Sequence, residues 1–400
     1  MKEPNIRFKG FSGEWKRSTL GDLALFSKGS GYSKSDICKE GTPVILYGRM
    51  YTKYQSVFDE IDTFVNPKDN SVVSKGGEVI IPGSGESSED ISLAAMVKNE
   101  GIILGGDLNI LKFNQKVNDP AFMSMAITYS PTRAELSSYS QGKTVVHLRN
   151  SEIAKGTIRY PDILEQNTIV NYVLSLDAQI LASTSRLASL KQMKAASLQA
   201  MFPQEGETVP KVRFKGFDGE WKAVKLGEIF SERNESNING EMLSVTQHNG
   251  IIKASENGRF DNSNSDKSGY KVVMVGDIAY NSMRMWQGAS GYSPYEGIVS
   301  PAYTVIIPQE GIHSPFFAYL FKNESIIKTF RLHSQGLTSD TWNLKFPAFS
   351  KIEVLFPMNI DEQKQIASFF TSLDRQIALH TQRLEKLKQI KAACLDKMFV

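Results

Sequence analysis

The chain has 400 residues, of which 41% are hydrophobic, and its 46 basic and 43 acidic residues give a net charge of +3. This length gives room for two domains with cores of their own, and the hydrophobic fraction argues against disorder. The two cysteines, Cys38 and Cys394, are too few for a disulfide framework or a zinc site, which favours a reducing compartment. No apolar run approaches the ~20 residues that cross a bilayer, and the first residues lack the apolar core of a signal peptide, so we expect a cytoplasmic protein without a membrane anchor.

Near its start the chain carries a decapeptide that it repeats after about half its length. Residues 7–16 read RFKGFSGEWK and residues 213–222 read RFKGFDGEWK, so the copies differ only where Ser12 is replaced by Asp218. Solenoid repeats have periods of about 20–50 residues, so this duplication indicates one larger unit that is used twice. We expect the decapeptide to be either a packed strand of the frame or a contact with one protein partner that binds on each side. Its altered residue is expected to face solvent.

The segments between the repeated blocks diverge. Residues 165–202 match residues 362–399 closely, whereas residues 22–140 and 228–334 show only scattered similarity. A constant frame favours one partner that is bound twice. Variable interiors favour two different ligands, or two versions of one ligand class.

Several short motifs resemble catalytic or metal-binding signatures without completing them. The run SSYSQGKT at residues 137–144 ends like a phosphate-binding loop, but Ser137 stands where the first glycine is required and a strand-like VVHL follows. The tripeptide Glu14-Trp15-Lys16 has no preceding aspartate to complete a nuclease metal site. The five histidines lack metal-ligand or nucleophile–base spacing. We therefore expect no catalytic residue and no metal site in this chain.

A long helix is predicted at the end of each half. Apolar residues recur there in alternating steps of four and three over about four to five heptads, which predicts a coiled-coil seam. The seam residues are Ile169, Val173, Leu176, Ile180, Leu187 and Leu190 in the first helix and Ile366, Phe370, Leu373, Ile377, Leu384 and Leu387 in the second. Since the two stripes are nearly identical, we expect the helices to pair with each other, antiparallel and with pseudo-two-fold symmetry. Polar seam residues at matching depths, among them Lys194 and Lys391, are expected to fix the register.

The sequence thus predicts a mixed α/β (α+β) protein with two globular domains, each followed by its long helix. The expected boundaries are a first domain at 1–160, a central helix at 161–202, a linker at 203–212, a second domain at 213–357 and a C-terminal helix at 358–400. Pro161 and Pro357 precede the helices and Pro203 follows the first, as prolines often do at helix boundaries.

Three signatures recur in both halves. They are RFKGF-x-GEW near the start, a Glu-Gln pair a few residues after Pro161 and Pro357, and the runs S-L-D-x-Q-I and L-K-Q-x-K-A-A in the helices. With them, the chain resembles the specificity subunit of a type I restriction–modification system over its whole length. The run YKVVMVGDIAYNSMRMWQGASGYSPYEGIVSPAYTVI of the second half is also typical, whereas the first half has GIILGGD at 101–107 in place of GIVSPAY.

The resemblance implies a subunit without catalysis of its own. Two target-recognition domains would each read one half of an asymmetric bipartite sequence in double-stranded DNA, with half-sites about 10 bp apart. The helices would act as a spacer and as a docking surface for two methyltransferase subunits, and restriction (endonuclease and translocase) subunits would join that complex. S-adenosylmethionine, ATP and Mg²⁺ would belong to the partners, so this chain is expected to hold no cofactor.

Two alternatives keep the same architecture. The first is the specificity subunit of a type II system with a separate subunit that cuts and methylates. The second is a non-DNA coiled-coil adaptor with two unlike binding heads. The adaptor draws support from the net charge of only +3, because free-standing nucleic-acid binders usually carry a clear basic excess.

The richest candidate for DNA contact in the first half is LYGRMYTKY at residues 46–54. It interleaves aromatic and basic side chains: Arg suits guanine, Lys suits phosphate or guanine, and Tyr suits phosphate or thymine methyl groups. An equal alternative is a half-buried strand with alternating tyrosines. The candidate residues of the first half are Lys34, Tyr47, Arg49, Tyr51, Lys53, Tyr54, Gln141 and Lys143.

In the second half the candidates lie mainly in TQHNGIIK at 246–253 and YNSMRMWQG at 280–288, where Gln and Asn suit the N6/N7 edge of adenine. Trp286 is expected in the core more than at a contact. Ser140-Gln141-Gly142 and Ser334-Gln335-Gly336 occupy matching places and are expected to be either backbone–phosphate anchors or structural turns. The candidate residues of the second half are Gln247, His248, Asn249, Lys253, Tyr280, Asn281, Arg284, Gln287 and Gln335.

Overall fold

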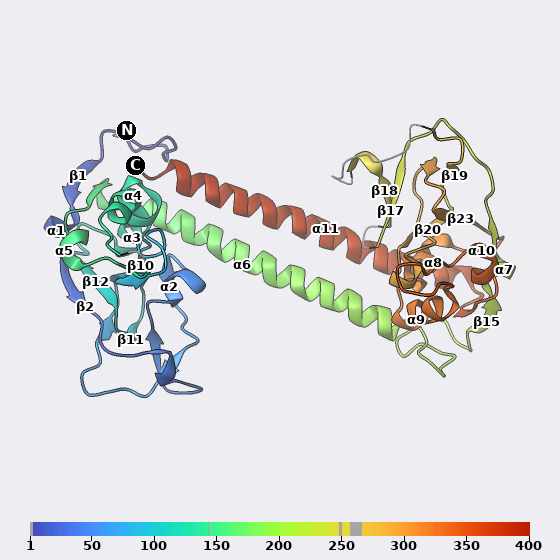
Figure 1. Ribbon diagram of the computed structural model, residues 1–400, viewed down its shortest axis with the longest axis horizontal. Helices are drawn as coiled ribbons and strands as arrows, with labels where there is room; N and C mark the ends of the chain where they lie inside the picture. The colour runs from blue at the N-terminus through green and yellow to red at the C-terminus, as the bar shows by residue number, and fades with distance from the viewer. Residues whose placement is uncertain (1–2, 143, 248–249, 257–265) are drawn as a thin grey trace. The chain divides into compact units, whose positions relative to one another are not determined.

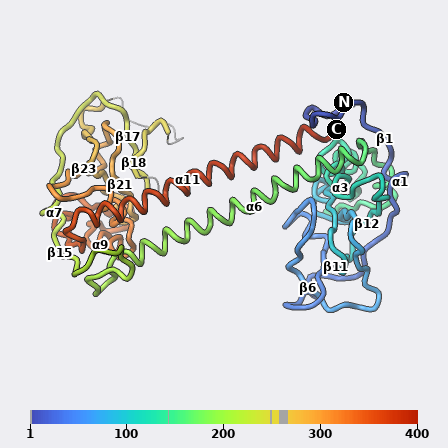
Figure 2. The backbone as a smooth tube through the Cα atoms, turned by 180° about the vertical axis from the view of Figure 1, so that it is seen from behind, coloured from blue at the N-terminus to red at the C-terminus, as the bar shows by residue number. Residues whose placement is uncertain are grey.

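The computed structural model describes residues 3–142, 144–247, 250–256 and 266–400, and the chain divides into two compact units. The first unit comprises the chain up to Ser183 together with Arg383–Val400, and the second comprises Thr184–Gln382. Each unit therefore joins a globular part to portions of both long helices. Both chain ends belong to the first unit, where the Ile6 N–H donates to the Lys397 carbonyl at 3.0 Å and the marked termini lie near each other (Figures 1 and 2).

The first unit is built on two five-stranded sheets. One has the strand order β2-β12-β8-β10-β5 and the other β3-β6-β4-β11-β7, and both mix parallel with antiparallel pairs. The strands are β1 (Lys16–Thr19), β2 (Ala24–Lys28), β3 (Ile37–Cys38), β4 (Thr42–Ile45), β5 (Val57–Phe58), β6 (Phe64–Val65), β7 (Val73–Lys75), β8 (Glu78–Pro82), β9 (Ser84–Gly85), β10 (Ala95–Val97), β11 (Glu100–Leu104), β12 (Leu108–Phe113), β13 (Val146–His147) and β14 (Thr157–Tyr160). The short helices are α1 (Leu20–Leu23), η1 (Lys34–Asp36), α2 (Arg49–Thr52), α3 (Pro120–Tyr129), α4 (Pro131–Ser138) and α5 (Asn150–Ile153).

The core of the first unit lies between the first of these sheets and α3. Every residue of β8 is buried, and α3 packs across β8 and β10 with every residue from Pro120 to Thr128 buried. A helix that is apolar on all sides is stable where it is buried on all sides, which explains this position. The carboxylate of Asp119 starts the helix by accepting hydrogen bonds from the Ala121 and Phe122 N–H groups at 2.7 and 3.1 Å.

The second unit has a smaller, antiparallel main sheet. Its strand order is β16-β23-β20-β21, and three two-stranded pairs accompany it: β15-β24, β17-β18 and β19-β22. The strands are β15 (Lys222–Lys225), β16 (Phe230–Glu232), β17 (Leu243–Thr246), β18 (Gly250–Lys253), β19 (Lys271–Val273), β20 (Ile278–Asn281), β21 (Ser290–Tyr292), β22 (Gly297–Val299), β23 (Tyr303–Pro308) and β24 (Glu353–Phe356). The short helices are α7 (Leu226–Ile229), η2 (Ala254–Glu256), η3 (Met285–Gln287), α8 (Ser314–Leu320), α9 (Glu324–His333) and α10 (Phe346–Phe349).

The two units repeat one plan. In each, the strand at the end of the decapeptide pairs antiparallel with the strand before the long helix, β1 with β14 and β15 with β24. In each, the strand after the first short helix forms one edge of the main sheet, β2 beside β12 and β16 beside β23. The expected mixed α/β class, with two globular copies that each precede a long helix, is confirmed.

The long helices α6 (Ile163–Ala200) and α11 (Ile360–Lys397) run antiparallel to each other. In the first unit the early part of α6 packs against the late part of α11, and in the second unit the late part of α6 packs against the early part of α11. Nine of the twelve predicted seam residues are buried, and Ile180, Leu187 and Ile377 are half-buried. The predicted antiparallel pairing is confirmed.

The two predicted register lysines each bind an aspartate of the facing helix. In the first unit Lys391 Nζ lies 2.5 Å from Asp177 Oδ1, and in the second Lys194 Nζ lies 2.5 Å from Asp374 Oδ1. The second unit adds the hydroxyl of Tyr319, which donates to Asp374 Oδ2 at 2.9 Å. The sequence pattern S-L-D of one helix is therefore the acceptor for the L-K-Q lysine of the other.

The repeated decapeptide fastens each globular part to the start of its own long helix. Arg7 donates to both carboxylate oxygens of Glu165, and Arg213 does the same to Glu362, at 2.7–2.8 Å. The tryptophans of both copies are buried. Because these contacts lie within the chain, packing of the frame explains why the arginine and the tryptophan are repeated. The residues at the altered position 12 and its counterpart 218 are exposed, as expected.

The glutamine after each of these glutamates ties the helix start to the globular part. Gln166 Nε2 donates to the Pro161 carbonyl at 2.9 Å, and Gln363 Nε2 donates to the Pro357 carbonyl at 2.9 Å. In both cases Oε1 accepts a backbone N–H, at 2.8 and 2.9 Å. The Pro…Glu-Gln signature is thus a buried hydrogen-bonded junction that is built twice.

Candidate nucleic-acid interface

The candidate segment at 46–54 forms the short helix α2 after β4, rather than a strand with alternating tyrosines. The side chain of Tyr47 is 38% exposed, and its ring centroid lies 6.4 Å from that of Tyr51. Burial, and then the neighbouring Tyr47, Glu86 and Asp90, raise the pKa of Tyr51. The segment therefore presents a pair of tyrosine rings next to acidic side chains.

The basic side chains of this segment are used inside the first unit. Arg49 is only 10% exposed and forms an ion pair with Asp62, whose other oxygen lies 2.6 Å from Lys53 Nζ. The hydroxyl of Tyr54 donates to the Ala94 carbonyl at 2.9 Å, and burial raises its pKa. These contacts fix α2 in place and occupy the groups that were expected to meet DNA.

Lys34 lies at the start of η1 and is exposed. Its neighbour Asp36 accepts from Lys68 Nζ at 2.7 Å and from the Ser33 N–H at 2.8 Å. These hydrogen bonds, that of Lys68 first, lower the pKa of Asp36 to about 2. The turn is thereby held in one conformation that leaves the Lys34 ammonium in solvent.

The first loop, residues 141–142 and 144–147, is closed by two backbone hydrogen bonds. The Gln141 N–H donates to the His147 carbonyl at 3.0 Å, and the His147 N–H donates to the Gln141 carbonyl at 2.8 Å. Gly142 has a φ of 132°, and a Cβ at this position would collide with the Val145 carbonyl oxygen. A side chain is therefore excluded there, and Gln141, just before the glycine, is exposed.

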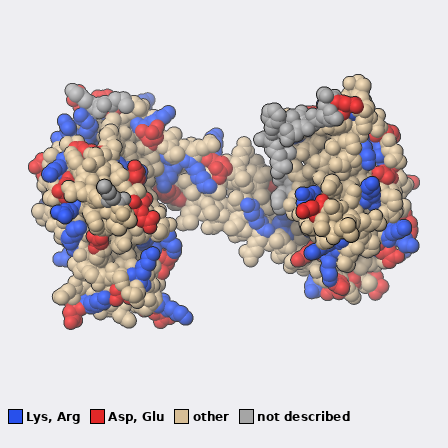
Figure 3. All heavy atoms as spheres, in the orientation of Figure 1, with Lys and Arg blue, Asp and Glu red and all other residues tan. Residues whose placement is uncertain are grey.

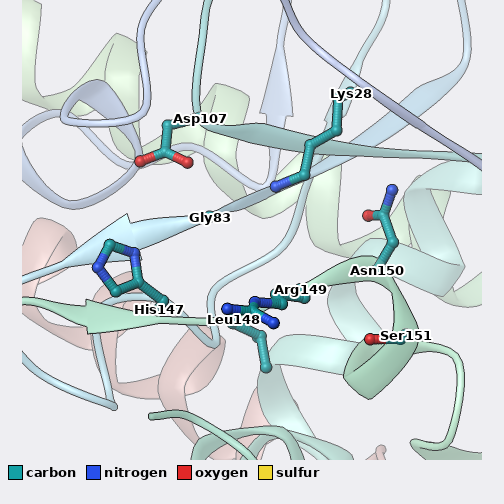
Figure 4. Close-up of a pocket in the computed structure, with 8 residues that line it drawn as sticks. All are labelled: Lys28, Gly83, Asp107, His147, Leu148, Arg149, Asn150 and Ser151. Carbon is teal, nitrogen blue, oxygen red and sulfur yellow. The ribbon is translucent and has the colours of Figure 1, made fainter. Parts of the chain in front are cut away.

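A pocket of about 570 Å³ opens beside the first loop (Figure 4). Its lining residues are Lys28, Gly83, Asp107, His147, Leu148, Arg149, Asn150 and Ser151. A Cβ on Gly83 would lie 3.1 Å from Lys28 Nζ and 2.7 Å from Asp107 Oδ1, so the glycine leaves room for both charged groups. His147 Nδ1 lies 2.8 Å from Ser84 Oγ, which holds the imidazole in place. The pocket thus gathers two cations, an imidazole and a carboxylate around one opening.

The second loop, residues 335–343, is closed in the same way. The Gln335 N–H donates to the Asn343 carbonyl at 3.0 Å, and the Asn343 N–H donates to the Gln335 carbonyl at 2.8 Å. Gly336 has a φ of 147°, and a Cβ there would lie 2.6 Å from the Thr341 carbonyl oxygen. The Ser-Gln-Gly segments, which matched in sequence, are therefore turns with one backbone design.

After each loop the chain returns to the main sheet of its unit at an equivalent point. The Leu148 N–H donates to the Gly83 carbonyl at 3.0 Å, one residue beyond β8. The Leu344 N–H donates to the Ser282 carbonyl at 2.8 Å, one residue beyond β20. The two loops are therefore structural counterparts.

In the second unit, Gln247 lies exposed in the turn between β17 and β18. The ammonium of Lys322 supports this turn from inside, donating to the carbonyls of Gln247 and Ser290 at 2.9 and 2.8 Å. Burial lowers the pKa of Lys322 to about 8, which leaves the ammonium charged near pH 7. Lys253 is bound by Glu241, with Nζ 2.9 Å from a carboxylate oxygen.

The segment after β20 divides into buried and accessible positions. Tyr280 has no exposed surface and stacks on Phe349 with ring centroids 5.0 Å apart, so it is a core residue rather than a DNA contact. Arg284 is exposed, while Asn281 and Gln287 are half-buried. These three side chains remain accessible from solvent.

The second loop meets η3 through two tryptophans. The rings of Trp286 and Trp342 lie 5.2 Å apart at 80°, and the guanidinium carbon of Arg331 lies 5.1 Å from the Trp342 ring. Both tryptophans are half-buried, so Trp286 does not lie in the core as expected. The fold thus brings the segment after β20 and the second loop together.

Three candidates, Lys143, His248 and Asn249, lie outside the described residues.

A sequence model of one protein family matches both halves of the chain. The family is described as the type I restriction modification DNA specificity domain, and the matched residues are 12–192 and 218–389. The chain belongs to this family. Each match begins inside a copy of the decapeptide and ends inside a long helix, so the two specificity domains follow the duplication. Membership favours DNA recognition over a coiled-coil adaptor.

One solved structure shares the fold of this specificity-domain protein, and a second is similar over the same length. The S subunit of a type I restriction–modification system from M. genitalium superposes with a TM-score of 0.59 at 15% identity, covering 100% of this chain and 99% of that chain. The HsdS subunit from Thermoanaerobacter tengcongensis gives a TM-score of 0.48 at 15% identity, with coverage of 100% and 99%. No curated protein sequence matches the chain.

The surface of the specificity-domain chain is mixed in charge. On the face drawn in Figure 3, Lys and Arg side chains are interspersed with Asp and Glu side chains, as the net charge of +3 implies. Among the described residues, no helix combines the length and apolarity needed to cross a membrane. Within the same residues, no three His, Cys, Asp or Glu side chains gather closely enough to hold a metal ion.

Three basic residues near the loops were missed by sequence reasoning. Lys28 and Arg149 line the pocket, and Lys345 is the counterpart of Arg149 in the second unit. All three lack an ion-pair partner within the described part of the chain, and Arg149 and Lys345 are exposed. A signal was present in the sequence, because Leu148 and Leu344 each follow a Ser-Gln-Gly segment and each precede a cation.

Proposed function

We propose that each unit binds double-stranded DNA and reads one half of an asymmetric bipartite sequence. The observation that carries this function is the pair of equivalent loops, which share their backbone hydrogen bonds and their Ser-Gln-Gly start and differ in most of the side chains that follow. A shared backbone suits phosphates, which are the same in every sequence, and different side chains suit different bases. Membership in the DNA-specificity family supports the same function.

The candidate residues fall into two groups: side chains that are accessible from solvent, and side chains that are already bound within their own unit. We assign direct DNA contact to the accessible side chains, namely Lys34, Tyr47, Gln141, Gln247, Asn281, Arg284, Gln287 and Gln335. Tyr51 supports the ring of Tyr47, while Arg49, Lys53 and Tyr54 act by holding α2. Lys253 is held by its ion pair within the unit.

We infer that α6 and α11 dock two methyltransferase subunits and set the spacing of the half-sites. Apolar side chains point outward from both helices: Leu181 is 69% exposed, Met193 47% and Leu379 56%. Exposed apolar side chains on helices support a protein-docking role. Restriction subunits then join the assembly. Catalysis belongs to the partners, which hold S-adenosylmethionine, ATP and Mg²⁺, and the assembly acts in the cytoplasm.

Genome-wide mapping of methylated adenines tests this function in a host that expresses the chain with its methyltransferase subunit. The expected motif has two specific parts separated by a gap of non-specific bases. Exchanging residues 22–140 for the interior of another specificity domain should change one part of the motif and leave the other intact. A motif that stays the same after the exchange would overturn the function.

A further inference from the structure

Two cations occupy the same place in the two units, directly after the closed loops. Arg149 follows Leu148 and Lys345 follows Leu344, and each leucine is hydrogen-bonded to the end of the equivalent strand of its main sheet. We propose that Arg149 and Lys345 anchor equivalent DNA phosphates. His147, which closes the first loop, and Trp342, which precedes the closing Asn343 of the second, then contact the neighbouring bases and help to make the half-sites differ. This inference rests on the function proposed above.

In the first unit the cation stands in a polar opening. Lys28 Nζ reaches the same pocket over Gly83, so two positive groups face one space that is large enough for a phosphate (Figure 4). The imidazole of His147 is fixed through Nδ1 by Ser84, and its Nε2 has no partner among the described residues. When the serine hydroxyl donates to Nδ1, Nε2 carries the proton and can donate to a DNA acceptor.

In the second unit Asn343 takes the place of His147, and the aromatic side chain is that of Trp342, one residue earlier. The Trp342 ring lies against Trp286 and under Arg331, and Leu337 of the same loop is fully exposed. Tryptophan and arginine planes can contact sugars and base methyl groups, and leucine can wedge against a base step. Lys345 is exposed beside this loop, as Arg149 is beside the first. The two units therefore share a cation at this point, and beside it the first unit is polar while the second is aromatic.

This pattern fits DNA better than a protein partner. A methyltransferase subunit that binds on both sides would need the same surface twice, whereas the loops share the backbone, the exposed Gln141 or Gln335 and the cation, and differ between these. DNA offers the same phosphate at each half-site and different bases beside it. The two loops have the matching combination, a shared cation for the phosphate and different side chains for the bases.

Binding of the purified complex of this chain with its methyltransferase subunits to duplexes that carry the mapped motif tests the inference. We expect Arg149→Ala and Lys345→Ala each to weaken binding to matched and unmatched duplexes alike. Each should also lower the slope of log affinity against log salt by about 1, as expected for one lost phosphate contact. Lys116→Ala is the matched control. Lys116 is an exposed lysine that comes after β12, whereas Asp107 of the pocket comes before that strand.

The loop residues have a different expected readout. His147→Ala should relax base preference in one half of the motif only, and Trp342→Ala in the other half only. If the wild-type complex binds the motif and none of these substitutions changes affinity, salt slope or preference, the inference is overturned and the proposed function stands. Loss of complex assembly in Arg149→Ala or Lys345→Ala, with DNA binding of the remaining complex unchanged, would also overturn it. Failure of the wild-type complex to bind any bipartite sequence would instead overturn the proposed function.

Discussion

Arg7 donates two parallel hydrogen bonds to the carboxylate of Glu165, which lies 158 positions later in the sequence. Nε donates to Oε1 at 2.8 Å and Nη2 donates to Oε2 at 2.7 Å. The side chain of Glu165 is only 1% exposed, so its carboxylate depends on this guanidinium. Arg213 and Glu362 form the same contact with the same geometry. The duplication of the decapeptide is therefore a duplication of one buried junction.

Replacing Arg7 by alanine should destabilise the first unit and leave the second unchanged. Removing one partner of a buried ion pair costs about 3–5 kcal/mol of folding free energy. Because the Arg7 side chain is 15% exposed, we expect a loss of about 3 kcal/mol or less. Hydrogen exchange read by mass spectrometry reports the two units separately. Arg213→Ala should give the mirror result, and Lys9→Ala is the exposed control within the decapeptide. Equal loosening of both units by Arg7→Ala would contradict the assignment.

Gly142→Ala should open the first loop. The positive φ and the collision of a Cβ with the Val145 carbonyl oppose any side chain, at a cost above about 1 kcal/mol. Faster exchange of the His147 N–H and weaker binding of the first half-site are the expected results. Gly31→Ala is the control, since a Cβ there meets nothing within 4 Å and no positive φ is involved. Unchanged exchange at His147 would show that the turn does not need its glycine.

Reversing the charge of Lys391 should weaken helix pairing in the first unit. Lys391→Asp places like charges together where Nζ now lies 2.5 Å from Asp177, and partial exposure of both groups limits the loss to about 0.5–1 kcal/mol. Urea unfolding with hydrogen-exchange readout measures it. The double exchange with Asp177→Lys should restore stability, and Lys386→Asp controls for helix propensity on an exposed position. If the double exchange is no more stable than the single, the pair does not set the register.

The pKa of Asp36 offers a test by titration. It lies near 2 because Lys68 and Ser33 hydrogen-bond its ionised form, so Lys68→Ala should raise it toward the ordinary 3.8. Since the folded value is below the unfolded one, the contact stabilises the fold above about pH 4 and loses that effect as the pH falls toward 2. Carbon NMR of the carboxyl group measures the midpoint. Lys39→Ala should leave it in place, and a midpoint unaffected by Lys68→Ala would remove Lys68 as the cause.

Arg49→Ala and Asp62→Ala should act alike on DNA recognition. Both changes break the ion pair that holds α2, so each should weaken methylation of the first half-site and spare the second. Genome-wide methylation mapping is the measurement. An effect of Arg49→Ala without an effect of Asp62→Ala would instead make Arg49 a direct reader of guanine.

The periodic parts of the molecule could be predicted from sequence, and the parts fixed by distant contacts could not. The seam from Ile169 to Leu190 follows a local rule of spacing, and its pairing follows because the second helix carries the same stripe. Tyr280 and Asn281 are neighbours in sequence, yet one lies in the core and the other faces partly outward, and only the packing of β20 decides this. Likewise, Arg49 looks like a free cation until Asp62 is placed beside it.

The first compact unit is assembled from two pieces that are far apart in the chain, whereas the second is one continuous stretch, so the order of synthesis matters for the first. Residues 383–400 follow the whole second unit in sequence. Phe399 nevertheless packs against Phe122 in the core of the first unit, with ring centroids 5.6 Å apart. During synthesis the core of the first unit therefore stays incomplete until residues 383–400 have left the ribosome. A chain that stops early would lose the closing piece of its first reader, so an unfinished protein would not present two working readers of DNA.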